Sequence, residues 1–125
     1  MKQRGFGEYV KKKRIKLGLT LREFCRKNDY DAGNISKIER GLMPPPQGKE
    51  LREKYAKALG LKKGTKEWLT FQDYAAVYSG RVPSDLLSEE EIVRKLPLLF
   101  RTIRDSQLDE LQLRELIDTL RKEMA

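Results

Sequence analysis

Apolar residues near the start of the chain recur at helical spacing between turn residues. The first predicted helix ends at Gly18, and its apolar face is interleaved with basic side chains and comprises Phe6, Tyr9, Val10 and Leu17. Thr20 and Glu23 have the spacing of a capping box, which opens a second helix ending near Asn28. The apolar residues of this second helix are Leu21, Phe24 and Cys25, which we expect to be core.

A third helix is predicted to follow after a tight turn at residues 28–30. Asp31 is its N-cap, and Ile35, Ile38 and the closing Gly41 indicate about three turns. Two short helices joined by a tight turn, with polar side chains exposed on the second, form the layout that inserts a helix into the major groove of DNA. The pattern therefore indicates a helix-turn-helix element.

The remainder of the chain is punctuated by proline and glycine. Residues 44–46 are all proline, which predicts a stiff connector after the third helix. Residues 79–83 read as a boundary, which predicts a DNA-binding domain at 1–79 and a helical tail at 80–125.

In the tail, residues 88–91 have the pattern of a capping box that opens a short helix stopped by Pro97. A second, charged helix follows, whose apolar residues are Leu108, Leu111, Ile117, Leu120 and Met124. A tail of this length is too short to fold alone, so its apolar face packs either onto its own domain or onto another chain.

Charge is distributed unevenly between the two halves of the 125 residues. The chain has a net charge of +8, but residues 1–60 carry 16 Lys and Arg against 7 Asp and Glu, a net of +9, whereas residues 61–125 carry a net of −1. A basic half of this kind favours a polyanionic partner, most simply nucleic acid. We expect double-stranded DNA, because no stacking platform for single-stranded RNA is evident.

Other classes of protein are disfavoured by residues that the chain lacks. It has no histidine and one cysteine, so we expect no zinc site, no internal disulfide and no cofactor. No paired nucleophile and base and no phosphate-binding loop are present, so we do not expect an enzyme. No segment has the length and apolarity of a membrane span or signal peptide, and we expect a cytoplasmic protein.

Two blocks of sequence resemble the lambda-repressor-like Cro/Xre family of helix-turn-helix regulators: residues 13–20, KRIKLGLT, and residues 34–41, NISKIERG. The likeness covers about residues 5–70, because Leu51 and residues 55–61 are similar to the fourth helix of that family. The resemblance implies an all-α protein: a five-helix DNA-binding domain with a C-terminal helical extension. Its fifth helix would follow Gly64 and Thr65, with Trp68 and Leu69 facing the core.

The resemblance also implies roles for particular residues. Arg14 and Glu39 occupy the positions of a structural ion pair in the family. The expected base-reading positions are Asn34, Lys37, Ala32 and Gly33. Asn suits adenine and Lys suits guanine or a phosphate, whereas Ala32 offers only a methyl group for thymine and Gly33 has no side chain at all. The expected phosphate contacts are Lys12, Arg22, Arg40, Lys37 and the backbone at Thr20.

We therefore predict a transcriptional regulator, most simply an autorepressor, that binds a palindrome as a homodimer. The tail sequence, with Leu96 and Pro97 before Phe100 and an Arg-Thr-Ile-Arg run, is similar to that of small regulators encoded beside a toxin. This likeness implies an antitoxin-like protein whose tail binds a toxin or another protein partner. The alternative is a protein-interaction adaptor on a helix-turn-helix scaffold, which Ala32 and Gly33 favour and the basic first half opposes.

Overall fold

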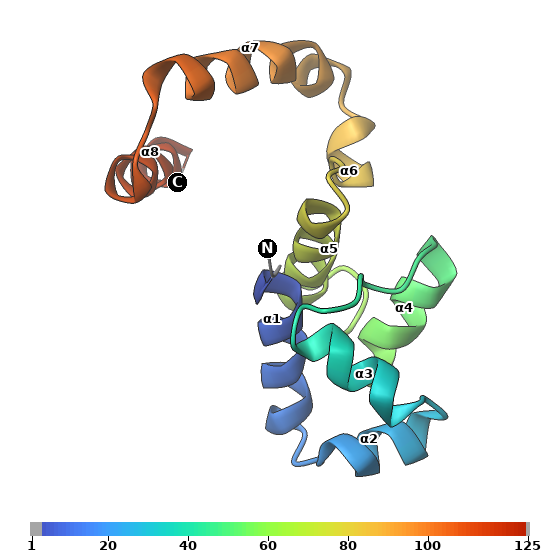
Figure 1. Cartoon of the computed structure of the whole chain (residues 1–125). Coiled ribbons are helices and arrows are strands. Elements are labelled where there is room, and N and C mark those ends of the chain that lie inside the picture. The colour runs from blue at the N-terminus through green and yellow to red at the C-terminus, as the bar shows by residue number, and fades with distance from the viewer. Residues whose placement is uncertain (1–3, 125) are drawn as a thin grey trace. The chain divides into compact units, whose positions relative to one another are not determined.

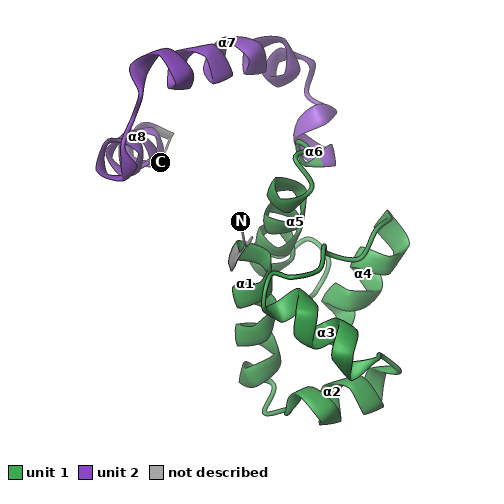
Figure 2. Cartoon of the chain, in the orientation of Figure 1, with its two compact units in different colours: residues 1–83 green, residues 84–125 purple. Residues whose placement is uncertain are grey.

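The computed structural model describes residues 4–124 of the chain, and all regular structure within them is helical (Figure 1). Two compact units are present, unit 1 at Met1–Pro83 and unit 2 at Ser84–Ala125 (Figure 2). Unit 1 contains α1 (Arg4–Lys16), α2 (Leu21–Asn28), α3 (Ala32–Glu39), α4 (Lys49–Ala58) and α5 (Lys66–Tyr78). Unit 2 contains α6 (Ser84–Leu87), α7 (Glu90–Ser106) and α8 (Glu110–Met124).

The helices of unit 1 begin and end where local chemistry favours it. Gly18 adopts a φ of 78°, a left-handed conformation that suits glycine and separates α1 from α2. The Thr65 side chain accepts a hydrogen bond from the backbone N–H of Trp68 and so caps α5. These boundaries set five short helices around one core.

Tyr55 of α4 lies at the centre of that core. Its ring centroid is 6.2 Å from that of Phe6 on α1 and 6.0 Å from those of Phe24 on α2 and Phe71 on α5. Helix α1 packs against α3 and α5, α2 packs against α3, and α4 packs against α5. Pro45 in the connector is also fully buried, so the proline segment is part of the core as well as a stiff link. The buried sides of α2 and α3 therefore pack against this aromatic core.

Two expectations for unit 1 are wrong in detail. Helix α3 has 8 residues, about two turns and not three, because the N–H groups of Gly41 and Leu42 bond back to Ile38 and Lys37 and end the helix in a glycine-containing cap. Leu69 is 44% exposed and does not face the core. It lies about 100° around α5 from the buried Trp68, whose face is continued by Phe71 and Ala75.

Unit 2 departs more clearly from the prediction. Pro97 lies inside α7, a helix of 17 residues, and does not stop it. A proline here removes one backbone hydrogen bond, to the carbonyl of Val93, and helix-favouring residues on both sides continue the helix. The predicted capping box is also absent, because the Ser88 hydroxyl donates to the carbonyl of Asp85 in α6, and no side chain caps the start of α7.

Candidate nucleic-acid interface

The turn between α2 and α3 is short, and hydrogen bonds define both ends of α2. At the start of α2, the Thr20 hydroxyl accepts from Glu23 N at 3.1 Å and Glu23 Oε1 accepts from Thr20 N at 3.1 Å, which completes the expected capping box. At its end, Asp29 is left-handed, with φ 59° and ψ 50°, and Tyr30 N donates to the Cys25 carbonyl at 2.8 Å. The chain therefore reverses within three residues, and α3 can start at once.

Helix α3 begins with a strong cap and presents a polar face. Asp31 Oδ2 accepts a hydrogen bond of 2.9 Å from the backbone N–H of Asn34. Ile35 and Ile38 are buried, whereas Gly33, Asn34, Lys37 and Arg40 are exposed. Because the exposed positions recur every three or four residues, they share one side of the helix. This side, which we call the α3 polar face, consists of Gly33, Asn34, Lys37 and Arg40.

The predicted base-reading residues differ in their surroundings. The side chains of Asn34 and Lys37 are exposed, and the ion pairs found within residues 4–124 do not involve Lys37. Gly33 is exposed but contributes only backbone. Ala32 is half-buried and packs against the core, so its methyl group is only partly accessible from outside. Of the four predicted base-reading residues, Asn34 and Lys37 are therefore the two with exposed polar side chains.

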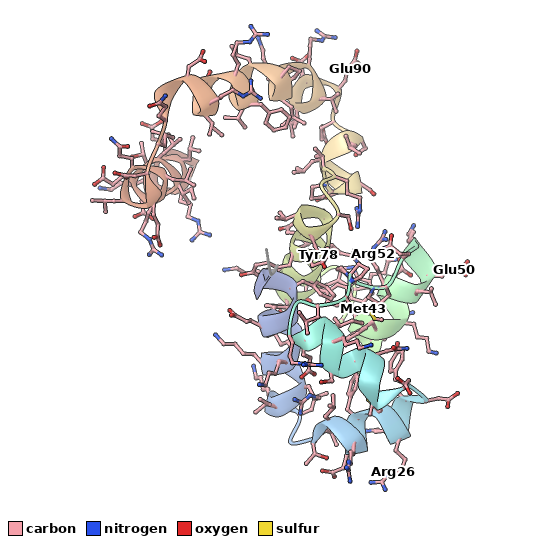
Figure 3. All side chains as sticks on the ribbon, viewed as in Figure 1. Arg26, Met43, Glu50, Arg52, Tyr78 and Glu90 are labelled. Carbon is pink, nitrogen blue, oxygen red and sulfur yellow. The ribbon has the colours of Figure 1, made fainter. Side chains whose placement is uncertain are left out.

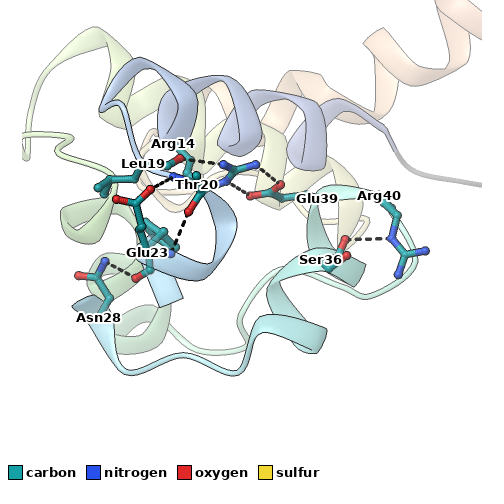
Figure 4. A network of polar contacts seen from close by, with 9 residues as sticks. Arg14, Leu19, Thr20, Glu23, Asn28, Ser36, Glu39 and Arg40 are labelled. Atoms are coloured by element: carbon teal, nitrogen blue, oxygen red, sulfur yellow. Dashed lines mark hydrogen bonds and ion pairs between the residues drawn. The ribbon is translucent and has the colours of Figure 1, made fainter. Parts of the chain in front are cut away.

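The residues predicted to contact phosphates are also exposed, with one difference. Lys12 and Arg22 are exposed on α1 and α2. Arg40 is exposed at the end of α3, with its Nε donating to the Ser36 carbonyl at 3.3 Å (Figure 4). Thr20 is different, because the Glu23 carboxylate already accepts from its backbone N–H.

The Glu23 carboxylate makes the start of α2 a poorer phosphate site than the sequence suggested. Its hydrogen bonds with Thr20 hold the pKa of Glu23 below its ordinary value, so the group is negatively charged at neutral pH. A phosphate approaching Thr20 would meet that charge. Arg26, on the same helix, was not among the predicted contacts; it is exposed and extends from the end of unit 1 formed by α2 (Figure 3).

The expected ion pair between Arg14 and Glu39 joins α1 to the last residue of α3 (Figure 4). Arg14 Nε and Nη2 donate to the two carboxylate oxygens at 2.7 and 3.0 Å, and Nη1 donates to the Leu19 carbonyl at 2.9 Å. The hydrogen bonds to Glu39 raise the pKa of Arg14 above its ordinary value. This network fixes the end of α3 relative to α1 and to the segment that leads into α2.

Gly7 is a positioning residue that the sequence analysis did not identify. A Cβ atom built on Gly7 would lie 2.5 Å from the carbonyl oxygen of Glu39 and 2.6 Å from that of Ile38. Glycine is thus needed for the close approach of α1 to the end of α3. The available signal was a glycine in the interior of a predicted helix, where it is usually unfavourable unless packing requires it.

The single cysteine of the chain lies in the core of unit 1. Cys25 is buried, and burial raises the pKa of its thiol, as suits a core residue rather than a nucleophile. Within residues 4–124 there is no group of three or more His, Cys, Asp or Glu side chains arranged to hold a metal ion. None of the described helices combines the length and apolarity that crossing a membrane requires.

Comparison of the chain with protein-family models, with curated proteins and with solved structures gave no match.

Proposed function

We propose that the protein is a sequence-specific, double-stranded DNA-binding regulator of the lambda-repressor-like, Cro/Xre type, with a five-helix DNA-binding domain in which α3 is the recognition helix. The observation that carries the proposal is the α3 polar face. It presents Asn34 and Lys37 on a helix whose opposite side is buried, directly after a three-residue turn. A rigid helix with an amide and an ammonium group on its outer side suits recognition of base edges in a major groove.

The distribution of charge supports the same proposal. The net charge of +9 in residues 1–60 belongs to the part of the chain that contains α2 and α3. Exposed Lys12, Arg22 and Arg40 lie on α1, on α2 and at the end of α3, where they suit contacts to the two phosphate backbones that border a groove. An adaptor that binds only protein has no need for this concentration of positive charge.

A single copy would read few bases. Two base-reading side chains, each discriminating by about 1–3 kcal/mol, leave a monomer poorly selective. We therefore include in the proposal a homodimer on a palindromic site, in a cytoplasmic autorepressor of the antitoxin type whose tail binds the second copy or a protein partner such as a toxin.

Fluorescence anisotropy with two duplexes of equal length tests the proposal. One duplex carries the DNA upstream of the protein's own gene and the other a scrambled sequence, and each is titrated with salt. We expect the upstream duplex to be preferred by roughly a thousandfold or more at physiological salt. Equal and steeply salt-dependent binding to both would instead mean adhesion to phosphates without sequence readout.

The second candidate function is the adaptor, which is favoured by one observation. Gly33 contributes no side chain to the α3 polar face and Ala32 is half-buried, so two of the four expected base-reading positions offer no hydrogen-bonding side chain. An adaptor would show no measurable binding to either duplex, even at low salt, where phosphate contacts are strongest.

A further inference from the structure

Helix α7 carries an apolar stripe that is mostly exposed, and Leu96 is the one half-buried residue in it. The stripe, which consists of Val93, Leu96, Phe100 and Ile103, follows a spacing of three, four and three residues. No residue of α7 is buried, and Phe100 is 49% exposed. Three-four spacing over three helical turns is typical of the seam between two paired helices. An apolar seam exposed to water is stabilised when a second helix of complementary shape covers it.

The order of side chains along the stripe matches a second copy of the same helix running in the opposite direction. If α7 is turned end over end about a two-fold axis near residue 98, Val93 faces Ile103 of the second copy and Leu96 faces Phe100 of the second copy. Each layer then pairs one smaller with one larger apolar residue, and the symmetry repeats each layer once. Parallel pairing would instead place Phe100 against its own counterpart.

Charges at the edge of the stripe favour the antiparallel arrangement independently. Glu90, in the first turn of α7 (Figure 3), and Arg104, in the last turn, lie on the same edge, two heptads apart. Facing positions on this edge meet each other in an antiparallel pair, so Glu90 of each copy comes beside Arg104 of the other. In a parallel pair Arg104 would come beside Leu99, and the opposite charges would not meet.

Helix α8 lacks this complementarity. Its stripe of Leu113, Ile117 and Leu120 is also exposed. The edge positions equivalent to Glu90 and Arg104 are Arg114 and Arg121, so the same construction on α8 brings two arginines together. Like charges across a helix pair oppose association. The two helices of the tail are therefore not equivalent as self-pairing surfaces.

We propose that α7 pairs antiparallel with α7 of a second copy of this chain, with Val93 against Ile103, Leu96 against Phe100 and Glu90 beside Arg104. The contact made by Glu90 within its own chain does not prevent this. It is an ion pair with Arg94 at 2.9 Å in which the two side chains are 84% and 62% exposed, and such pairs contribute little and exchange readily.

The inference deepens the proposed function, because it assigns the dimer to one helix and one register. It does not require DNA binding, and its test contains no DNA. If the tail dimer forms but neither duplex is bound, the proposed function fails and this inference stands. If DNA is bound but the α7 dimer does not form, the proposed function stands and only the assignment of the dimer to α7 fails.

Cross-linking of full-length protein tests direction and register together. Val93→Cys and Ile103→Cys are prepared separately, and each is oxidised alone and as an equal mixture. Antiparallel pairing predicts a disulfide-linked dimer in the mixture and little in either variant alone, with the unchanged protein, whose Cys25 is buried, as the blank. Linkage within each variant alone, or none in the mixture, would overturn the proposal.

Sedimentation velocity tests whether the stripe holds the dimer together. Phe100→Glu should shift the protein from dimer to monomer, whereas Leu98→Glu, an equal change at a 55% exposed position on the other side of α7, should not. Arg104→Glu should weaken the dimer at least tenfold, and Glu90→Arg combined with Arg104→Glu should restore it. A monomeric unchanged protein at micromolar concentration, or no rescue by the double exchange, would contradict the proposal and would point to a different protein as the occupant of the stripe.

Discussion

The guanidinium of Arg14 and the carboxylate of Glu39 are joined by two hydrogen bonds, of 2.7 and 3.0 Å, across the space between α1 and the end of α3. The side chains are only 9% and 6% exposed. The same guanidinium bonds to the Leu19 carbonyl just before α2. One buried pair therefore connects α1, the segment before α2 and the end of α3.

Glu39→Ala should lower the free energy of unfolding by about 3–5 kcal/mol, because Arg14 would remain buried without its counter-charge. Thermal and urea unfolding followed by circular dichroism measure the change. Glu53→Ala is the control, since Glu53 lies 3.9 Å from the well-exposed Lys63 and its pair should contribute about 0–1 kcal/mol. An equal loss in the two variants would argue against a special role for Arg14 and Glu39.

Gly7→Ala should destabilise unit 1 by about 1–3 kcal/mol, since the new methyl group would clash with the carbonyls of Ile38 and Glu39. The direction is diagnostic, because alanine in place of glycine in an exposed helix interior normally stabilises by about 1 kcal/mol. Gly5→Ala on the same helix would come within 2.9 Å of the Tyr74 ring, which is a 39% exposed side chain and not backbone, and should cost less than Gly7→Ala. Unfolding curves of the two variants provide the comparison, and a stabilised Gly7→Ala protein would exclude the proposed close contact.

The all-helical class and most boundaries in unit 1 could be predicted because their signals are local. The Thr20 and Asp31 caps and the left-handed Gly18 each depend on residues within one turn of the boundary. Pro97 shows where local reasoning fails. The rule that proline ends a helix considers only the one backbone hydrogen bond that proline removes, whereas the other backbone hydrogen bonds of this 17-residue helix remain. Leu69 was misplaced because a single apolar residue beside Trp68 does not indicate which side of the helix is buried.

The candidate site was predictable in its outline and not in its contacts. Asn34 and Lys37 could be chosen from their chemical type and position. The hydrogen bonds between Thr20 and Glu23 follow from the capping box that the sequence predicts. The structure adds that Glu23 accepts from the Thr20 backbone N–H, the group that was expected to bind a phosphate. The role of Gly7 was hidden because it depends on carbonyls of residues 38 and 39, which are far away in sequence. Contacts between segments that are distant in sequence cannot be predicted from local patterns, whereas helix caps can.

Tyr55→Phe should stabilise the protein slightly, by about 1 kcal/mol or less, and should make it more resistant to alkali. The buried Tyr55 hydroxyl has no hydrogen-bond partner within the part of the chain that the structure describes, so its removal costs no hydrogen bond. Burial raises the pKa of Tyr55 well above its ordinary value of 10.0.

The raised pKa fixes the sign of the pH dependence. The unfolded chain releases the Tyr55 proton near pH 10, whereas the folded protein retains it, so this contribution to stability is complete below pH 10 and is lost as the pH rises above it. Urea unfolding at a series of alkaline pH values should show a shallower decline for Tyr55→Phe than for the unchanged protein. Identical slopes would mean that another group, such as Tyr30, whose pKa burial also raises, dominates.

Lys37→Ala and Asn34→Ala should affect DNA binding in different ways, because Lys37 contributes a positive charge as well as a base contact, whereas Asn34 contributes only a base contact. Lys37→Ala removes both the charge and the base contact, so it should weaken binding to both duplexes, lower the slope of log affinity against log salt by about one and reduce the preference for the upstream duplex. Asn34→Ala should leave that slope unchanged and reduce the preference for the upstream duplex by about 1–3 kcal/mol, because it removes a bidentate base contact. Lys66→Ala is the charge-matched control, since Lys66 is exposed on α5, a helix that packs against α1 and α4. If Lys66→Ala weakened binding as much as Lys37→Ala, net charge and not the α3 polar face would account for the affinity. If Asn34→Ala left the preference for the upstream duplex intact, other residues would read the bases.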